Sequence, residues 1–119
     1  MKITSYQDLR VWQKAMDLSV MVYGKTKQFP KEEVYGLTSQ IRRAAFAIPA
    51  NIAEGYSRGH IADYIRFLRI AFSSGAELET HLLIAKRVGI LKNPDFAILS
   101  GILTEVMKML NVLMTKLQT

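Results

Sequence analysis

Apolar residues recur every three or four positions in four successive segments of the chain, which is the spacing of one face of an α-helix. No segment shows the strict alternation that is typical of a strand. The four segments run from residue 5 or 8 to 28, from 33 to 56, from 60 to 88 and from 95 to 117. Breaks at Pro30, Gly59 and Gly89 keep the connections short, and short connections favour antiparallel neighbours. The pattern predicts one all-α domain over residues 1–119, an antiparallel up-down-up-down four-helix bundle.

The chain has more apolar positions than a single four-helix bundle can bury. The first segment has a predicted core stripe and, beside it, a second apolar line, so that its apolar arc is very broad. Phe46 and Ile70 point away from the core stripes of their own segments. These surplus positions favour a subunit interface in a symmetric homo-oligomer. The predicted core stripe of the first segment is Leu9, Trp12, Met16, Val20 and Tyr23, and the second line is Val11, Ala15, Leu18 and Val22.

The stretch AIPANIAEGYSR, residues 47–58, places a proline inside the second segment. The apolar period continues through it, so we expect the helix to bend at Pro49 and not to end there. Proline has no N–H, so the carbonyl of Ala45 loses its helical donor. We expect the neighbouring residues to have structural roles: Asn51 satisfies a loosened backbone group, Glu54 forms an ion pair on the side that it shares with Arg43 and Arg58, and Gly55 permits close packing.

Composition narrows the class of protein. The 119 residues include no cysteine, which excludes disulfides and cysteine-ligated zinc, and half of them are hydrophobic, which excludes a disordered chain. Sixteen basic and ten acidic residues give a net charge of +6, which favours association with nucleic acid. Lys and Arg interrupt the apolar runs and the N-terminus has no signal-peptide pattern, so we expect a cytoplasmic protein without a membrane span.

No set of side chains predicts catalysis, a cofactor or a metal. A di-iron bundle requires Glu-x-x-His pairs, and the nearest approach is Glu77 with His81 on the polar side of the third segment. His60 lies at a predicted helix start, near Asp63. We therefore expect a protein that is not an enzyme.

Glu79 is the one charge that falls within a predicted apolar stripe, between Gly75 and Leu82. A buried carboxylate requires a partner. The residues that we expect to supply one are Arg43, Asn51 and Lys86, and a structural ion pair is favoured over a functional acid.

Arginines concentrate in the middle of the chain, whereas lysines dominate its ends. Guanidinium groups match phosphate geometry better than ammonium groups do, because they can donate two parallel hydrogen bonds. In an oligomer the arginines would repeat around an axis and form a dense positive surface. The candidate nucleic-acid-binding residues are Arg42, Arg43, Arg58, Arg66, Arg69 and Arg87.

Three stretches together resemble one bacterial family: SYQDLRVWQKAMDL, FPKEEVYGLTSQIRRAAFAIPANIAEGYSRG and YIRFLRIAFSSGAELETHL. They resemble the proteins encoded by intervening sequences in 23S ribosomal RNA genes, a family that extends to the accessory variability proteins of diversity-generating retroelements. The resemblance covers residues 3–91. It implies an antiparallel four-helix bundle that assembles as a homopentamer with a basic channel, and retroelement members bind nucleic acid and the reverse transcriptase. The chain has His60 and Asp63 where the family often has Ser or Thr and Glu, a weaker capping box.

Two functions stay open at this point. One is a homo-oligomeric protein that binds RNA or DNA through backbone phosphates. The other is a scaffold or accessory subunit for an acidic partner protein, such as a reverse transcriptase, with nucleic-acid binding incidental.

Overall fold

The computed structural model describes residues 4–119, in which four long α-helices and two short 3-10 helices occur and no strand is present. The elements are η1 (Tyr6–Asp8), α1 (Arg10–Thr26), η2 (Lys31–Glu33), α2 (Leu37–Ser57), α3 (Ile61–Arg87) and α4 (Asn93–Leu117). The prediction of an all-α fold with four helices is confirmed.

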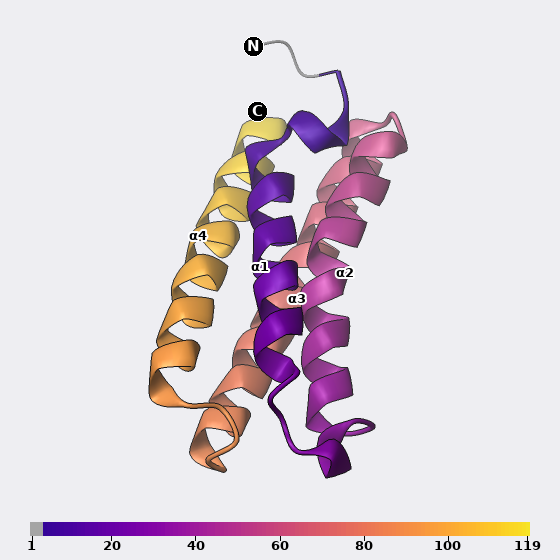
Figure 1. Ribbon diagram of the computed structural model, residues 1–119. Coiled ribbons are helices and arrows are strands. Elements are labelled where there is room, and N and C mark those ends of the chain that lie inside the picture. The colour runs from indigo at the N-terminus through magenta and orange to yellow at the C-terminus, as the bar shows by residue number, and fades with distance from the viewer. Residues whose placement is uncertain (1–3) are drawn as a thin grey trace.

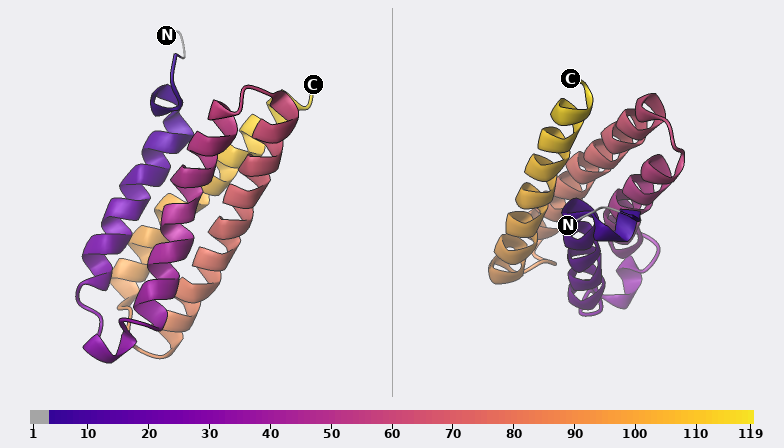
Figure 2. Two further views of the ribbon diagram at one scale, coloured as in Figure 1. Left: turned by 90° about the vertical axis from the view of Figure 1, so that its right-hand side faces the viewer. Right: turned by 90° about the horizontal axis from the view of Figure 1, so that it is seen from above.

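The four helices pack side by side along their lengths (Figures 1 and 2). α1 contacts α2 and α4, and α3 contacts the same two helices, so α1 and α3 lie diagonally across the bundle. η1 packs against α1 and α2 at one end of the bundle, while η2 and the α3–α4 connection lie at the other (Figure 1). The position of a polar side chain can therefore be given by the pair of helices that it lies between and by the end of the bundle that it is near.

Two glycines make the tight connections possible. Gly59, between α2 and α3, and Gly89, which follows the C-cap residue Val88 of α3, both have φ of +80°. This is the left-handed region, in which a side chain is strained and glycine is not. His60 is the N-cap residue of α3, and its side chain makes no capping hydrogen bond. Pro94 follows in the first turn of α4, where a missing N–H costs nothing.

The core is aliphatic and continuous between the helices. Leu18, Ile41, Leu68 and Leu110 are completely buried, one on each helix. Leucine and isoleucine side chains in this state each contribute about 1.5–3 kcal/mol through burial. Packing of these stripes holds the bundle together.

The core face of α1 was predicted wrongly. The structure buries the second apolar line, Val11, Ala15, Leu18 and Val22, and leaves Met16, Val20 and Tyr23 exposed. Periodicity shows that a helix has two apolar lines but not which of them faces its neighbours. The short aliphatic line allows close packing on α2 and α4, and the bulkier line lies along an open groove.

The burial of Glu79 was also predicted wrongly. Glu79 is exposed, and within residues 4–119 it makes no ion pair. Its neighbour Leu78 is the core residue, and one further position turns a helix by about 100°, which moves Glu79 off the buried face. Asn51, expected as one of its partners, donates instead to the carbonyl oxygen of Ala47 at 2.7 Å. This is not the carbonyl that Pro49 leaves without a donor, so the prediction that Asn51 satisfies a group loosened by the proline is not confirmed.

α2 and α3 approach closely where Gly55 lies. A Cβ atom placed on Gly55 would be 2.6 Å from Cβ of Phe67 and 3.3 Å from the carbonyl oxygen of Tyr64. No larger residue fits without moving the α3 backbone. The expected close-packing role of Gly55 is confirmed.

α2 continues through Pro49, as predicted. The carbonyl of Ala45, which cannot bond to Pro49, lies 3.2 Å from the hydroxyl oxygen of Ser19 on α1. The same hydroxyl is 2.9 Å from the carbonyl oxygen of Ala15 on its own helix, so its proton is shared between the two acceptors. Ser19 is buried, and its hydroxyl is therefore placed to satisfy the group that the proline leaves open.

Ser19→Ala should lower the free energy of unfolding by about 1–2 kcal/mol, because the buried Ala45 carbonyl loses its donor. In a Pro49→Ala background residue 49 has an N–H, and the cost of Ser19→Ala should fall to less than about half. Urea unfolding of the four proteins of this cycle gives the coupling energy. Equal costs in both backgrounds would show that the two features are independent.

α4 is long and apolar enough to cross a membrane by length and composition alone, with a mean hydropathy of 1.6. The sequence prediction that charged residues exclude such a segment was therefore too strict, because only Glu105 and Lys108 interrupt the run from Phe96 to Thr115. In the structure the helix packs Leu99, Leu103, Val106, Leu110 and Met114 into the bundle.

Candidate nucleic-acid and subunit interfaces

Two arginines stack on one buried aromatic ring near the α2–α3 turn. The guanidinium carbon of Arg58 lies 4.9 Å from the centre of the Phe67 ring, and that of Arg66 lies 4.7 Å from it. Phe67 is buried against Gly55, so the ring is a fixed platform. A guanidinium above an aromatic face is attracted to the ring and keeps its N–H donors at the edge. The Phe67 platform therefore positions two cations at one end of the bundle.

Two carboxylates partly neutralise the positive charges of Arg58 and Arg66. Arg58 pairs with Glu54 at 3.1 Å, so the predicted ion pair of Glu54 forms with Arg58 and not with Arg43, and Arg66 lies 3.9 Å from Asp63. All four side chains are at least one-third exposed, and exposed ion pairs contribute little free energy. Arg69, one turn beyond Arg66, is exposed and makes no ion pair within residues 4–119. We name Arg58, Arg66 and Arg69 the turn arginines.

The guanidinium group of Arg42 is held by contacts with other residues of the same chain. Its Nε donates to the hydroxyl oxygen of Thr26 at 2.8 Å, and its guanidinium lies 4.3 Å from the centre of the Tyr23 ring. A terminal nitrogen also donates to the Tyr23 carbonyl oxygen at 3.4 Å. Arg42 therefore braces α2 against α1, and fewer of its donors remain for a phosphate.

The six candidate arginines do not form one patch on a single chain. Arg43 is exposed in the second turn of α2, about 20 Å along that helix from Arg58, at 1.5 Å per residue. Arg87 is exposed in the last turn of α3, more than about 25 Å from Arg69 by the same measure. The structure thus brings Arg58 and Arg66 together on one ring, with Arg69 one turn further along α3, and leaves the other three near the opposite end.

Tyr64 lies beside the Phe67 platform and has an unpartnered hydroxyl. Its ring meets that of Tyr56 edge-on, with the ring centres 5.7 Å apart. The hydroxyl oxygen is buried and has no hydrogen-bond partner within the described residues. Burial raises the pKa of Tyr64 to about 12, with a smaller contribution from Tyr56.

Tyr64→Phe should leave stability at pH 7 unchanged or raise it by up to about 1 kcal/mol, since it removes an unsatisfied hydroxyl. Above pH 10 the unfolded tyrosine ionises before the folded one, whose pKa is about 12, so rising pH should destabilise the wild type relative to the variant. Urea unfolding at pH 7 and at about pH 11 measures both effects. A stability difference that is constant with pH would contradict this account.

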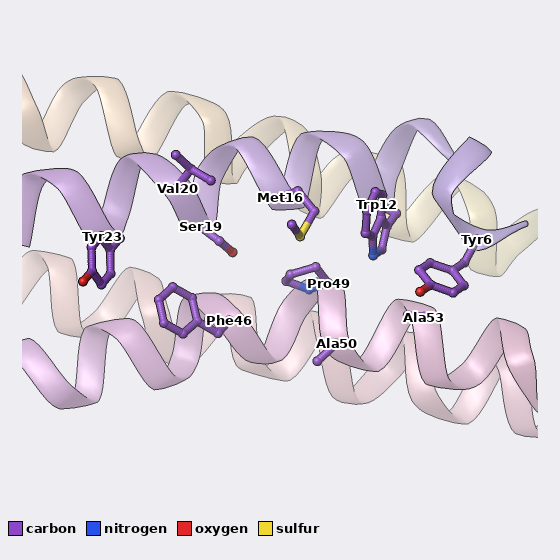
Figure 3. A pocket seen from close by; sticks show the side chains of 10 residues that line it. All are labelled: Tyr6, Trp12, Met16, Ser19, Val20, Tyr23, Phe46, Pro49, Ala50 and Ala53. Carbon is purple, nitrogen blue, oxygen red and sulfur yellow. The ribbon is translucent and has the colours of Figure 1, made fainter.

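An apolar groove of about 480 Å³ lies between α1 and α2 (Figure 3). Ser19 and Pro49 belong to its lining, together with the small side chains of Ala50 and Ala53. Large apolar side chains complete it: Tyr6, Trp12, Met16, Val20, Tyr23 and Phe46. We name it the α1/α2 groove.

The α1/α2 groove combines residues that were predicted to point away from the core with residues that were predicted to lie in it. Phe46 is 41% exposed, which confirms that it points away from the core, and Ile70 on α3 is also exposed. Met16 and Tyr23, however, were assigned to the core, so the groove itself was missed. An exposed line of large apolar side chains next to a helix with outward-facing alanines was its signal in the sequence.

His81 and Glu77 are not a simple surface pair. His81 Nε2 lies 3.9 Å from the Glu77 carboxylate but is itself buried, with no hydrogen-bond partner in the described part of the chain. Within residues 4–119 no three His, Cys, Asp or Glu side chains gather in a way that could hold a metal.

Comparison with known proteins agrees with this architecture. The family model of the 23S rRNA-intervening sequence protein matches residues 7–112. The crystal structure of a protein of unknown function from the S23 ribosomal protein family of Bacteroides thetaiotaomicron VPI-5482 superposes with a TM-score of 0.83. The two are 25% identical, and the match covers 88% of this chain and 95% of the other. No curated protein sequence matches significantly.

The family match extends from η1 almost to the end of α4 and therefore includes both the turn arginines and the α1/α2 groove. It covers well over half of the chain. The protein belongs to the 23S rRNA-intervening sequence protein family.

Proposed function

We propose that this protein is a non-enzymatic nucleic-acid-binding protein that assembles as a homopentamer of antiparallel, up-down-up-down bundles. It binds RNA or DNA through backbone phosphates and without base readout. The observation that carries the proposal is the placement of Arg58 and Arg66 on the Phe67 platform, with the exposed Arg69 one turn further along α3, in a chain of net charge +6. Phosphate contacts of this kind are independent of nucleotide sequence.

The turn arginines suit phosphate for a structural reason. Arg58 and Arg66 are already oriented by the ring, so less conformational entropy is lost when they bind. A phosphate can replace Glu54 and Asp63 as their partner, because those pairs are exposed and weak. Arg69 adds a third cation, and Arg43 and Arg87 extend the contacts in the assembly.

Assembly repeats the small group of positive charges of one chain in every subunit. Three arginines in one chain neutralise few phosphates, whereas a ring of chains presents the same group repeatedly. The α1/α2 groove supplies an apolar surface for such contacts, with Phe46 and Met16 exposed beside small alanines. The exposed Ile70 on α3 lies on a different face, as the head-to-tail contacts of a ring require.

A charge-matched pair of triple variants tests the role of the turn arginines. Arg58→Gln/Arg66→Gln/Arg69→Gln should weaken binding to a labelled RNA hairpin or DNA duplex by about tenfold or more at low salt. The control Lys27→Gln/Lys31→Gln/Lys92→Gln removes the same charge from exposed positions elsewhere and should change binding much less. Equal losses in the two variants would refute a defined phosphate site, and fluorescence anisotropy measures both.

A further inference from the structure

A second apolar groove, of about 380 Å³, lies between the start of α1 and the last turns of α4. Its floor is apolar: Leu9, Val11, Met109, Val112 and Leu113. Three cations form its rim: Arg10, Lys108 and Lys116. We name it the α1/α4 groove. Its chemistry differs from that of the α1/α2 groove, whose lining residues carry no charge.

The charge of the α1/α4 groove is of one sign. None of the eight lining residues is acidic, and within residues 4–119 none of the three cations forms an ion pair. Glu105, one turn before Lys108, is bonded to Lys14 of α1 at 2.6 Å. This hydrogen bond and the charge of Lys14 lower the pKa of Glu105, with a smaller effect of Lys108. The adjacent carboxylate is thus already compensated.

The spacing of these side chains sets the size of an occupant. Lys108, Val112 and Lys116 follow one another at four-residue intervals and therefore share one face of α4. Lys108 and Lys116 are about 12 Å apart along the helix, at 1.5 Å per residue. Val112 lies between them and is 54% exposed. An apolar strip flanked by cations over two turns is complementary to a helix that has an apolar stripe flanked by carboxylates.

We propose that the α1/α4 groove docks an acidic amphipathic helix of a partner protein. The partner's apolar side chains enter between α1 and α4, and its glutamates or aspartates face Arg10, Lys108 and Lys116. Nucleic acid fits this surface less well, because a phosphate backbone gains nothing from an apolar floor. A second copy of this chain docked groove to groove also fits poorly, because Arg10, Lys108 and Lys116 of one chain would face the same three cations of the other.

The probe is a labelled, blocked peptide of about four helical turns with leucines on one face and glutamates on both flanks. We expect saturable binding to the full chain at micromolar peptide, and a gain in peptide helicity by circular dichroism. Val112→Asp should weaken binding at least about tenfold, since it places a carboxylate against the acidic rim of the probe. Ile98→Asp is the control, because Ile98 is 43% exposed on the same helix but lies outside the groove.

The rim is tested by Lys108→Glu/Lys116→Glu against Lys31→Glu/Lys92→Glu, which changes the net charge equally at other exposed sites. Only the first pair should weaken peptide binding more than about threefold beyond the general charge effect. The turn-arginine triple variant should bind the peptide as its lysine control does, so failure of this proposal is distinguishable from failure of nucleic-acid binding.

Equal weakening by groove and control variants, or no binding by the wild type, would overturn the proposal. So would a Val112→Asp protein of altered oligomeric state by light scattering, since the groove would then be a subunit contact. Preferential binding to vesicles that contain anionic lipid, lost in the same variants, would assign the groove to a membrane surface instead.

Discussion

Gly55→Ala should lower the free energy of unfolding by about 2 kcal/mol. Alanine favours a helix over glycine by about 1 kcal/mol, but its methyl group would lie 2.6 Å from Cβ of Phe67, an atom fixed to the α3 backbone. Overpacking of this kind costs about 1–3 kcal/mol and exceeds the helical gain when the backbone must move. Urea or thermal unfolding measures the difference. The variant should also loosen the Phe67 platform and so weaken nucleic-acid binding.

Two matched glycines show whether the close approach is the cause. Gly101 lies within α4 with no atom within 4 Å of a Cβ placed there, so Gly101→Ala should stabilise the protein by up to about 1 kcal/mol. Gly75 meets chiefly the end of the Met107 side chain, which is flexible and can move. Gly75→Ala should therefore lie between the other two. A stabilising Gly55→Ala would show that α2 and α3 are not held together as described.

Phe46→Asp should convert the proposed homopentamer to monomers. Phe46 is 41% exposed, so the substitution removes little from the core of one chain, but it would bury a carboxylate in an apolar subunit contact. The cost of such a charge is several kcal/mol at each contact, enough to abolish association at micromolar protein. Light scattering coupled to size exclusion measures the mass, and circular dichroism verifies the helices.

Ile98→Asp is the matched control for this change. Ile98 is 43% exposed and lies on α4, outside the α1/α2 groove. The control should keep the mass of the wild type. A Phe46→Asp protein of unchanged mass would exclude the α1/α2 groove from the interface, and a monomeric wild type would remove the assembly from the proposed function.

The fold was largely predictable because helical periodicity and helix breakers are local. The four helices, the continuation of α2 through Pro49 and the cap at Gly89 all follow from residues near in sequence. It was harder to predict which face of each helix is buried. On α1, two apolar lines compete, and the choice depends on how close α2 and α4 come, which a single helix does not encode. Glu79 was misplaced as well, because it directly follows the buried Leu78 and one further position turns the side chain to the exposed side of α3.

The sites were predictable in part. The concentration of arginines in the middle of the chain indicated where phosphate contacts could lie, and the structure places two of the six candidates, Arg58 and Arg66, on one aromatic ring. The platform under them was missed, because Phe67 lies outside the three- and four-residue spacing of Tyr64, Leu68 and Phe72 that predicts the buried face of this helix. The contacts of Arg42 could not be predicted, because its partners Thr26 and Tyr23 lie 16 and 19 residues away in the sequence and only the fold brings them together.

The salt dependence of nucleic-acid affinity shows whether the turn arginines hold phosphates. We predict that the wild type binds a DNA duplex and an RNA hairpin at low salt, and that the logarithm of its affinity falls linearly with the logarithm of salt concentration. Each neutralised phosphate contributes about 0.9 to the slope on duplex DNA, so loss of the turn arginines should reduce it by about 2–3 for each bound chain. No binding at low salt, or an affinity that salt does not change, would contradict the account.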